Sequence, residues 1–146
     1  MSRLAACACV LLAAQAPQVS EPAVRFRAFD LFIDSGASPL AAWQVEVRFE
    51  SAETKVVGVE GGEGPAHTDP AYYDAAALQG GRIVLARFTL EPSPPAGVIR
   101  VARLHVATSA RAGGGLAHTL SVAAAAGPEG EPLTVQASLL PAGETR

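Results

Sequence analysis

The histidines are the first residues in this chain that could do chemistry, as metal ligands or as general bases. His67, His105 and His118 stand far apart, and the H-x-x-x-H and H-E-x-x-H spacings that place two imidazoles on one helix face are absent. His67 and Asp69 are two residues apart in a glycine-rich loop, which makes only a weak pair of ligands. The sequence therefore predicts no metal site.

The serines and carboxylates also lack a catalytic arrangement. No G-x-S-x-G nucleophile elbow is present, and D-S-G-A-S at residues 34–38 is typical of a hairpin turn. A glycosidase needs two carboxylates across a cleft, but none of the 14 acidic residues has a distinctive context. We expect Asp69 or Asp74 to cap a short helical turn before A-A-A-L. Calcium at these oxygens is left open, although no EF-hand loop is present. We predict no enzyme activity and no cofactor.

Tyr72 and Tyr73 are the only tyrosines, and they are adjacent in a loop. Adjacent loop positions rarely bury both side chains, so we expect one ring to anchor the loop and the other to face solvent. An exposed tyrosine is a favoured contact in protein and sugar interfaces. With Asp74 the pair forms the first candidate binding patch. The alternative is that both rings pack the loop onto the fold.

A second candidate patch consists of basic residues on expected strands. Arg87 and Thr89 lie on one strand, and Arg103 and His105 lie on another. We expect all four on an outer sheet face. Arginine is enriched at interfaces because its guanidinium donates several hydrogen bonds. The alternative is that these are ordinary solvated strand residues.

The overall charge excludes two classes of partner. The chain of 146 residues has 11 Lys and Arg against 14 Asp and Glu. It therefore provides neither the basic stripe that binds nucleic acid nor a polybasic patch for anionic lipid. We expect no nucleic-acid partner and no insertion into a membrane.

The N-terminus has the layout of a secretory signal peptide over residues 1–16. Arg3 precedes an apolar run at residues 4–14, and A-Q-A at residues 14–16 has the pattern of a cleavage site. The run is too short to anchor the chain in a bilayer. We predict a secreted or periplasmic protein, with lipid attachment through the lipobox-like L-A-A-C at residues 4–7 as an alternative. Both cysteines lie in this segment, so the mature domain is expected to have no disulfide.

Alternation with a period of two residues dominates the rest of the chain and predicts strands. Around residues 24–34 the apolar set changes phase between Ala28 and Phe29, which predicts a bulge or two short strands. We expect one all-β domain over residues 24–140, an antiparallel sandwich of about eight or nine strands, and a flexible tail at residues 141–146. The expected strands lie in residues 23–35, 40–50, 54–62, 81–91, 98–108, 116–126 and 133–140.

The single tryptophan lies in the clearest of these segments. Trp43 shares its face with Val45, Val47 and Phe49, whereas the opposite face carries Gln44, Glu46, Arg48 and Glu50. A change of register by one residue would bury three charges. The pattern therefore predicts that Trp43 is a core residue and not an exposed platform for sugars.

The order of these motifs resembles the opening of a bacterial cohesin domain. A turn leads into L-A-A-W-Q-V-E-V at residues 40–47, and a V-G-V strand follows at residues 57–59. Two later segments, G-R-I-V-L-A-R-F-T-L at residues 81–90 and V-I-R-V-A-R-L-H-V at residues 98–106, are similar to central strands of that family. The resemblance covers roughly residues 24–140.

The resemblance implies a nine-stranded jelly roll related to carbohydrate-binding modules, with no catalytic activity. Cohesins bind dockerins, which are calcium-loaded modules carried by enzymes. We therefore expect an extracellular protein–protein recognition module, such as one in a polysaccharide-degrading system. Direct carbohydrate binding is the alternative, and it would require a coplanar row of exposed aromatic rings.

Overall fold

The chain folds as an all-β protein. The computed structural model describes residues 23–111 and 116–144. This part of the chain contains one short 3-10 helix, η1 (Ala75–Ala77), and seven strands, fewer than the eight or nine that the sequence predicts. The strands are β1 (Val24–Asp34), β2 (Ala42–Phe49), β3 (Lys55–Gly61), β4 (Arg82–Phe88), β5 (Val98–Ser109), β6 (His118–Ala126) and β7 (Gln136–Pro141).

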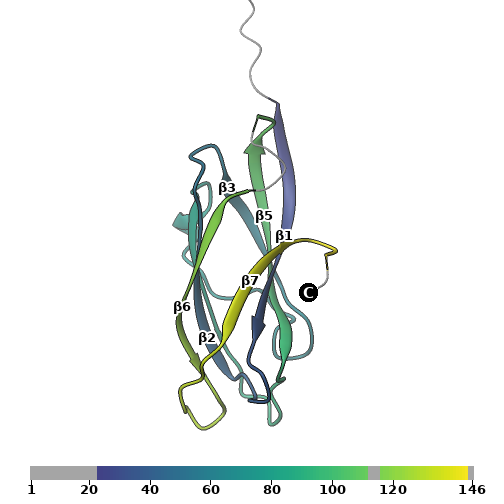
Figure 1. Cartoon of the computed structure of the whole chain (residues 1–146), viewed down its shortest axis with the longest axis vertical. Coiled ribbons are helices and arrows are strands. Elements are labelled where there is room, and N and C mark those ends of the chain that lie inside the picture. The colour runs from purple at the N-terminus through teal and green to yellow at the C-terminus, as the bar shows by residue number, and fades with distance from the viewer. Residues whose placement is uncertain (1–22, 112–115, 145–146) are drawn as a thin grey trace, which may run out of the picture.

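The strands form two antiparallel sheets. The larger sheet has the order β3-β5-β1-β7, and the smaller has the order β4-β2-β6. Figure 1 shows the two sheets as layers of one elongated body, with β7 passing close to β6 in front. Apolar residues from both sheets form a single core, as in a β-sandwich.

Strand β2 shows how the core forms. Trp43, Val45, Val47 and Phe49 are all buried, whereas the residues between them are partly or fully exposed. Side chains alternate between faces along a strand, so this pattern fixes which face packs inward. Trp43 is 3% exposed. The prediction that it is a core residue is confirmed.

Strand β1 carries apolar residues on both of its faces. Phe29, Leu31 and Ile33 are buried, whereas Val24 and Phe26 are exposed on the other face of the same continuous strand. The predicted irregularity between Ala28 and Phe29 is therefore wrong. The register against β5 shifts instead between Leu31 and Phe32. This continuity is one reason why the strand count is lower than expected.

The structure describes the domain from Ala23 at its N-terminal end to Glu144 at its C-terminal end. The predicted signal peptide at residues 1–16 lies outside the described residues. Pro141, the first residue of the predicted tail, is the last residue of β7, and the Ala142 N–H donates a hydrogen bond to the Ala28 carbonyl. Residues 145–146 of the predicted tail lie outside the described residues. No helix in the described ranges is long and apolar enough to cross a membrane.

Candidate binding face

Arg87 organises the long loop that precedes η1. Its Nε donates to the Ala66 carbonyl at 2.7 Å, and its Nη1 donates to the Asp69 and Pro70 carbonyls at 3.1 and 3.2 Å. We call residues 62–72 the Arg87 loop. Three carbonyls facing one guanidinium fix the loop against β4, because the planar donor group has a rigid geometry.

The predicted placement of Arg87 on an outer face is wrong. Arg87 has the same parity as Ile83 and Leu85, which are buried, and it lies opposite Trp43 of β2. It therefore points from the inner side of the sheet toward the loop. Arg103 and His105 lie on β5 of the other sheet, so the three basic residues do not share one face.

The Arg87 loop ends by extending the smaller sheet. The Tyr72 N–H donates to the Ala86 carbonyl at 2.8 Å, and the Ala86 N–H donates to the Tyr72 carbonyl at 3.0 Å. This pairing puts the Tyr72 side chain on the outer face, where it is 64% exposed. The Tyr72 ring lies beside Phe88, which is 59% exposed, with centroids 6.2 Å apart and an angle of 19° between ring planes.

The neighbours of Tyr72 have structural roles. Tyr73 packs against the core, so the prediction that one tyrosine anchors the loop and the other faces solvent is confirmed. Asp74 accepts a hydrogen bond from the Ala76 N–H at 2.9 Å and caps η1, as predicted for one of the two aspartates. Of the predicted patch of Tyr72, Tyr73 and Asp74, only Tyr72 is therefore an exposed side chain that neither packs against the core nor caps η1.

Small side chains surround the two exposed rings. The strand register places Ala86 opposite Gln44 and Gln44 opposite Ala124, while Phe88 lies opposite Ala42. Together these side chains border a shallow pocket of about 260 Å³. We call this surface the alanine face. It consists of Ala42, Gln44, Tyr72, Ala86, Phe88 and Ala124.

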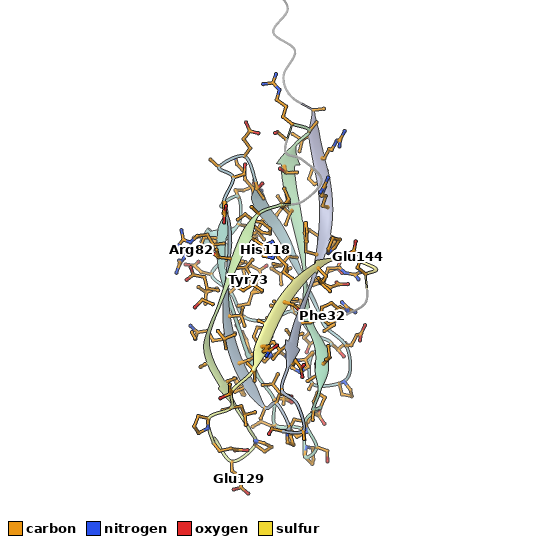
Figure 2. The ribbon with its side chains drawn as sticks, in the orientation of Figure 1. Phe32, Tyr73, Arg82, His118, Glu129 and Glu144 are labelled. Carbon is orange, nitrogen blue, oxygen red and sulfur yellow. The ribbon has the colours of Figure 1, made fainter. Side chains whose placement is uncertain are left out.

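Charged side chains begin farther along the same outer surface. Glu46 accepts hydrogen bonds from Arg82 at 2.7 Å and from Arg48 at 3.3 Å. The hydrogen bond from Arg82 is the main reason why the pKa of Glu46 lies below its usual value. Figure 2 shows Arg82 extending outward at the edge of the molecule. The alanine face therefore has an uncharged centre and a charged border on this side.

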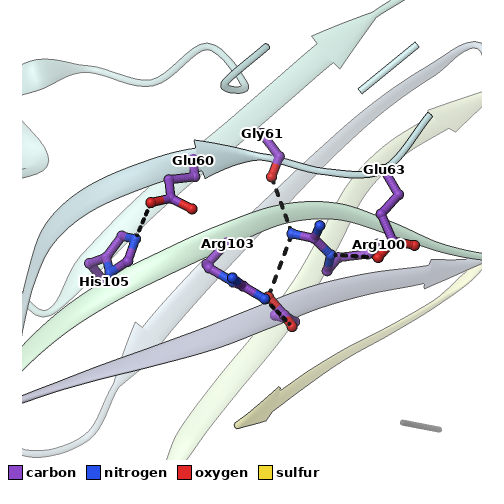
Figure 3. A network of polar contacts seen from close by, with 7 residues as sticks. Glu60, Gly61, Glu63, Arg100, Arg103 and His105 are labelled. Atoms are coloured by element: carbon purple, nitrogen blue, oxygen red, sulfur yellow. Dashed lines mark hydrogen bonds and ion pairs between the residues drawn. The ribbon is translucent and has the colours of Figure 1, made fainter. Parts of the chain in front are cut away.

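The larger sheet places Arg103 in a network of ion pairs, and it places His105 beside Glu60. Arg103 donates to Asp30 through Nε at 2.7 Å and Nη2 at 3.0 Å, and His105 Nε2 lies 2.8 Å from Glu60 Oε1. Arg100, which the sequence analysis did not single out, contacts Glu63 and the Gly61 carbonyl. Figure 3 shows these partners across β3 and β5.

The charged side chains of this network already have partners within the chain. Asp30 is 4% exposed, and its hydrogen bonds with Arg103 hold the pKa of its carboxyl below the usual value. A paired charge loses its existing partner when it binds another, so these residues offer less to a ligand than free ones would. The geometry favours the alanine face over the Arg103 and His105 surface.

His67 is the residue whose environment the sequence analysis did not anticipate. It lies in the Arg87 loop, is 1% exposed, and has its ring 6.4 Å from that of Trp43. Burial, with a smaller effect of the Arg87 charge, lowers its pKa to about 4. Nothing in the loop sequence is periodic, so no pattern could show that this histidine faces the core.

A second apolar surface lies on the larger sheet. Phe26, which is 75% exposed, and Val24 border a pocket with Lys55 and Val57. The charged side chains of Lys55 and Glu53 also border this pocket. Phe26 is therefore a strongly exposed strand phenylalanine outside the alanine face.

Within the described residues no metal-binding cluster is found, and no similarity to a known protein points to another site. Among the described residues, no group of three or more His, Cys, Asp or Glu side chains is placed to hold a metal ion. No family model matches the chain, and neither a curated protein nor a solved structure shows significant similarity to it. The resemblance to cohesins therefore stays a prediction from the sequence.

Proposed function

We propose that this chain is a secreted, non-catalytic binding module that recognises another extracellular protein through the alanine face. The observation that carries the proposal is the exposed pair of Tyr72 and Phe88 beside a shallow pocket bordered by alanine side chains. Large apolar rings left in water cost free energy, which burial against a partner recovers.

The composition of the alanine face supports a protein partner. Protein interfaces concentrate aromatic residues at the centre, deplete charges there and keep polar residues at the rim. Here Tyr72 and Phe88 adjoin small side chains, while Glu46 and Arg82 stand farther out. Tyrosine is also among the residues that contribute most to binding.

The proposal includes the finer features that the sequence resemblance implies. These are a cohesin-like jelly-roll topology, export by the N-terminal segment, and a partner carried by an extracellular system such as polysaccharide degradation. A dockerin-like module is the form of partner that the resemblance implies. Of these features, only the β-sandwich architecture has support in the two antiparallel sheets.

Direct carbohydrate binding is the second candidate, because one observation favours it. The rings of Tyr72 and Phe88 are stacked with 19° between their planes, and both are strongly exposed. Sugar rings stack on such planes, and the exposed Gln44 amide nearby could exchange hydrogen bonds with hydroxyl groups. Two rings make a short platform, which would suit a ligand of a few sugar units.

The test compares three immobilised proteins: the wild type, the double variant Tyr72→Ala with Phe88→Ala, and the control Phe26→Ala. Each is exposed to culture supernatant of the source organism and, separately, to insoluble cellulose, chitin and xylan. We expect a supernatant protein to be retained by the wild type and by Phe26→Ala, and lost from the double variant. Retention of a polysaccharide with the same pattern would support the second candidate.

Equal retention by all three proteins would contradict a binding role of the alanine face. Loss from Phe26→Ala alone would move the site to the larger sheet. The control is matched, because Phe26 and Phe88 are both strongly exposed strand phenylalanines on the outer faces of their sheets.

A further inference from the structure

The interior side of the Arg87 loop contains a buried histidine whose ring nitrogens are unsatisfied. Neither His67 Nδ1 nor Nε2 has a hydrogen-bond partner among the described residues, and the same is true of Trp43 Nε1 beside it. Burying a polar group without a partner costs free energy. Burial in the closed loop therefore favours the neutral form of His67. No described group accepts a hydrogen bond from its ring N–H.

The charged groups around His67 oppose its protonation. Arg87 of β4 is the charged group whose effect on His67 is resolved, and it is a cation. Asp69 of the loop itself lies 3.6 Å from Arg87 but is largely exposed, while β2 contributes the uncharged Trp43. A second positive charge at His67 would therefore meet repulsion from Arg87 and the desolvation cost of burial.

The same loop positions Tyr72. Arg87 binds carbonyls on both sides of His67, and the loop then leads through Pro70 and Ala71 into the pairing of Tyr72 with Ala86. A loop that leaves the sheet to hydrate His67 would release the contacts that hold Tyr72 beside Phe88. Opening of the loop at His67 would therefore also displace Tyr72 from Phe88.

We propose that His67 makes the Arg87 loop an acid-sensitive gate, closed at neutral pH and opened as His67 takes up a proton, with loss of the alanine face. As a statement about ligand binding, this inference rests on the proposed function. As a statement about the loop, it stands on the burial of His67 and on the contacts of Arg87.

The pH window follows from the two states of the histidine. In the closed loop the pKa of His67 is about 4, whereas an exposed histidine has a pKa of about 6.5. Above 6.5 both states are neutral, and the closed loop has its full stability. Between 6.5 and 4 the open state takes up the proton first, so the opening equilibrium grows about tenfold for each unit of pH.

Amide hydrogen exchange measures this opening directly. The Gly62 and Tyr72 amides donate to the His67 and Ala86 carbonyls in the closed loop, so their exchange requires opening. With intrinsic exchange rates corrected for pH, we expect their protection to fall about a hundredfold between pH 7 and pH 4.5 in the wild type. Far-UV circular dichroism should stay unchanged over this range.

Two variants assign the effect. His67→Phe keeps a ring and removes both unsatisfied nitrogens, so its loop protection should not depend on pH. His105→Gln removes a surface histidine and should behave as the wild type. Equal pH dependence in His67→Phe and in the wild type would overturn the proposal.

A measurement on the unmodified protein keeps the test independent of how the variants fold. The ring signals of His67, followed by nuclear magnetic resonance, should show a neutral imidazole down to pH 5. A midpoint near 6.5 with no change in loop protection would overturn the gate. If the loop opens as expected while no ligand binds at any pH, the gate stands and the proposed function fails. If a ligand binds equally at pH 7 and pH 4.5 and loop protection does not fall between these values, the function stands and the gate fails.

Discussion

Trp43 and His67 meet at the point where the smaller sheet contacts the Arg87 loop. Their rings lie 6.4 Å apart, and both are almost wholly buried. The tryptophan contributes a large apolar surface and one unsatisfied nitrogen, whereas the smaller histidine ring has two unsatisfied nitrogens and can take up a proton. At the scale of single residues, one side chain stabilises the fold and the other makes it sensitive to acid.

Replacing Trp43 with alanine should destabilise the protein strongly. The change removes a buried ring from between two sheets, so we expect the free energy of unfolding to fall by roughly 3–5 kcal/mol. Urea denaturation followed by circular dichroism measures it. Tyr72→Ala is the control, because an exposed ring should cost little. A loss of less than about 1 kcal/mol for Trp43→Ala would show that the ring is not a core residue.

The sequence predicts single residues well only where a strand pattern is continuous. Trp43 was predictable, because charges on the opposite face of β2 exclude the other register. The same reasoning from Ile83 and Leu85 places Arg87 inward and Phe88 outward, contrary to the expectation that Arg87 lies on an outer face. His67 has no such pattern, since a loop has no fixed direction for its side chains.

At the scale of elements, the Arg87 loop depends on one guanidinium. Three carbonyls, those of Ala66, Asp69 and Pro70, accept hydrogen bonds from Arg87. The loop in turn places Tyr72 on the outer edge of β4. This pairing joins residues that are 14 positions apart, so the sequence could indicate an exposed tyrosine but not its neighbour Phe88.

Arg87→Lys should loosen this loop. A lysine keeps the charge but cannot reach three carbonyls with a rigid planar group, so we expect a loss of roughly 1–3 kcal/mol in the free energy of unfolding. Arg82→Lys on the same strand is the control, because its exposed pair with Glu46 should contribute little. Urea denaturation of both variants decides the matter, and equal losses would contradict the anchoring role of Arg87.

At the scale of the whole molecule, the outer faces of the two sheets differ in the side chains that they carry. The outer face of the larger sheet carries the ion pairs around Asp30 and the exposed Phe26. The outer face of the smaller sheet carries the alanine face and, beyond it, the ion pairs of Glu46. The sequence predicted an all-β protein with two-faced strands. It could not predict which outer face remains open, because that depends on which strands become neighbours.

Global stability should fall with acid in two stages. From pH 6.5 to about 4 the unfolded chain protonates His67 before the folded one does, which removes about 3 kcal/mol. Asp30 has its pKa lowered from 3.8, so its contribution is present above that value and is lost as the pH falls further. Urea denaturation at pH 7, 5.5 and 4.5 tests the first stage, which His67→Phe should abolish. An unchanged first stage in that variant would contradict the assignment to His67.

The affinity of the retained partner for the alanine face tests the central claim most directly. With the partner recovered by the wild type, surface plasmon resonance at pH 7 compares the wild type, Tyr72→Ala with Phe88→Ala, and Phe26→Ala. We expect the double variant to bind at least about 30-fold more weakly, the scale of interface residues that dominate binding, with an unchanged melting temperature. Phe26→Ala should bind as the wild type does. An equal Kd for the double variant and the wild type would contradict the assignment of this face as the binding site.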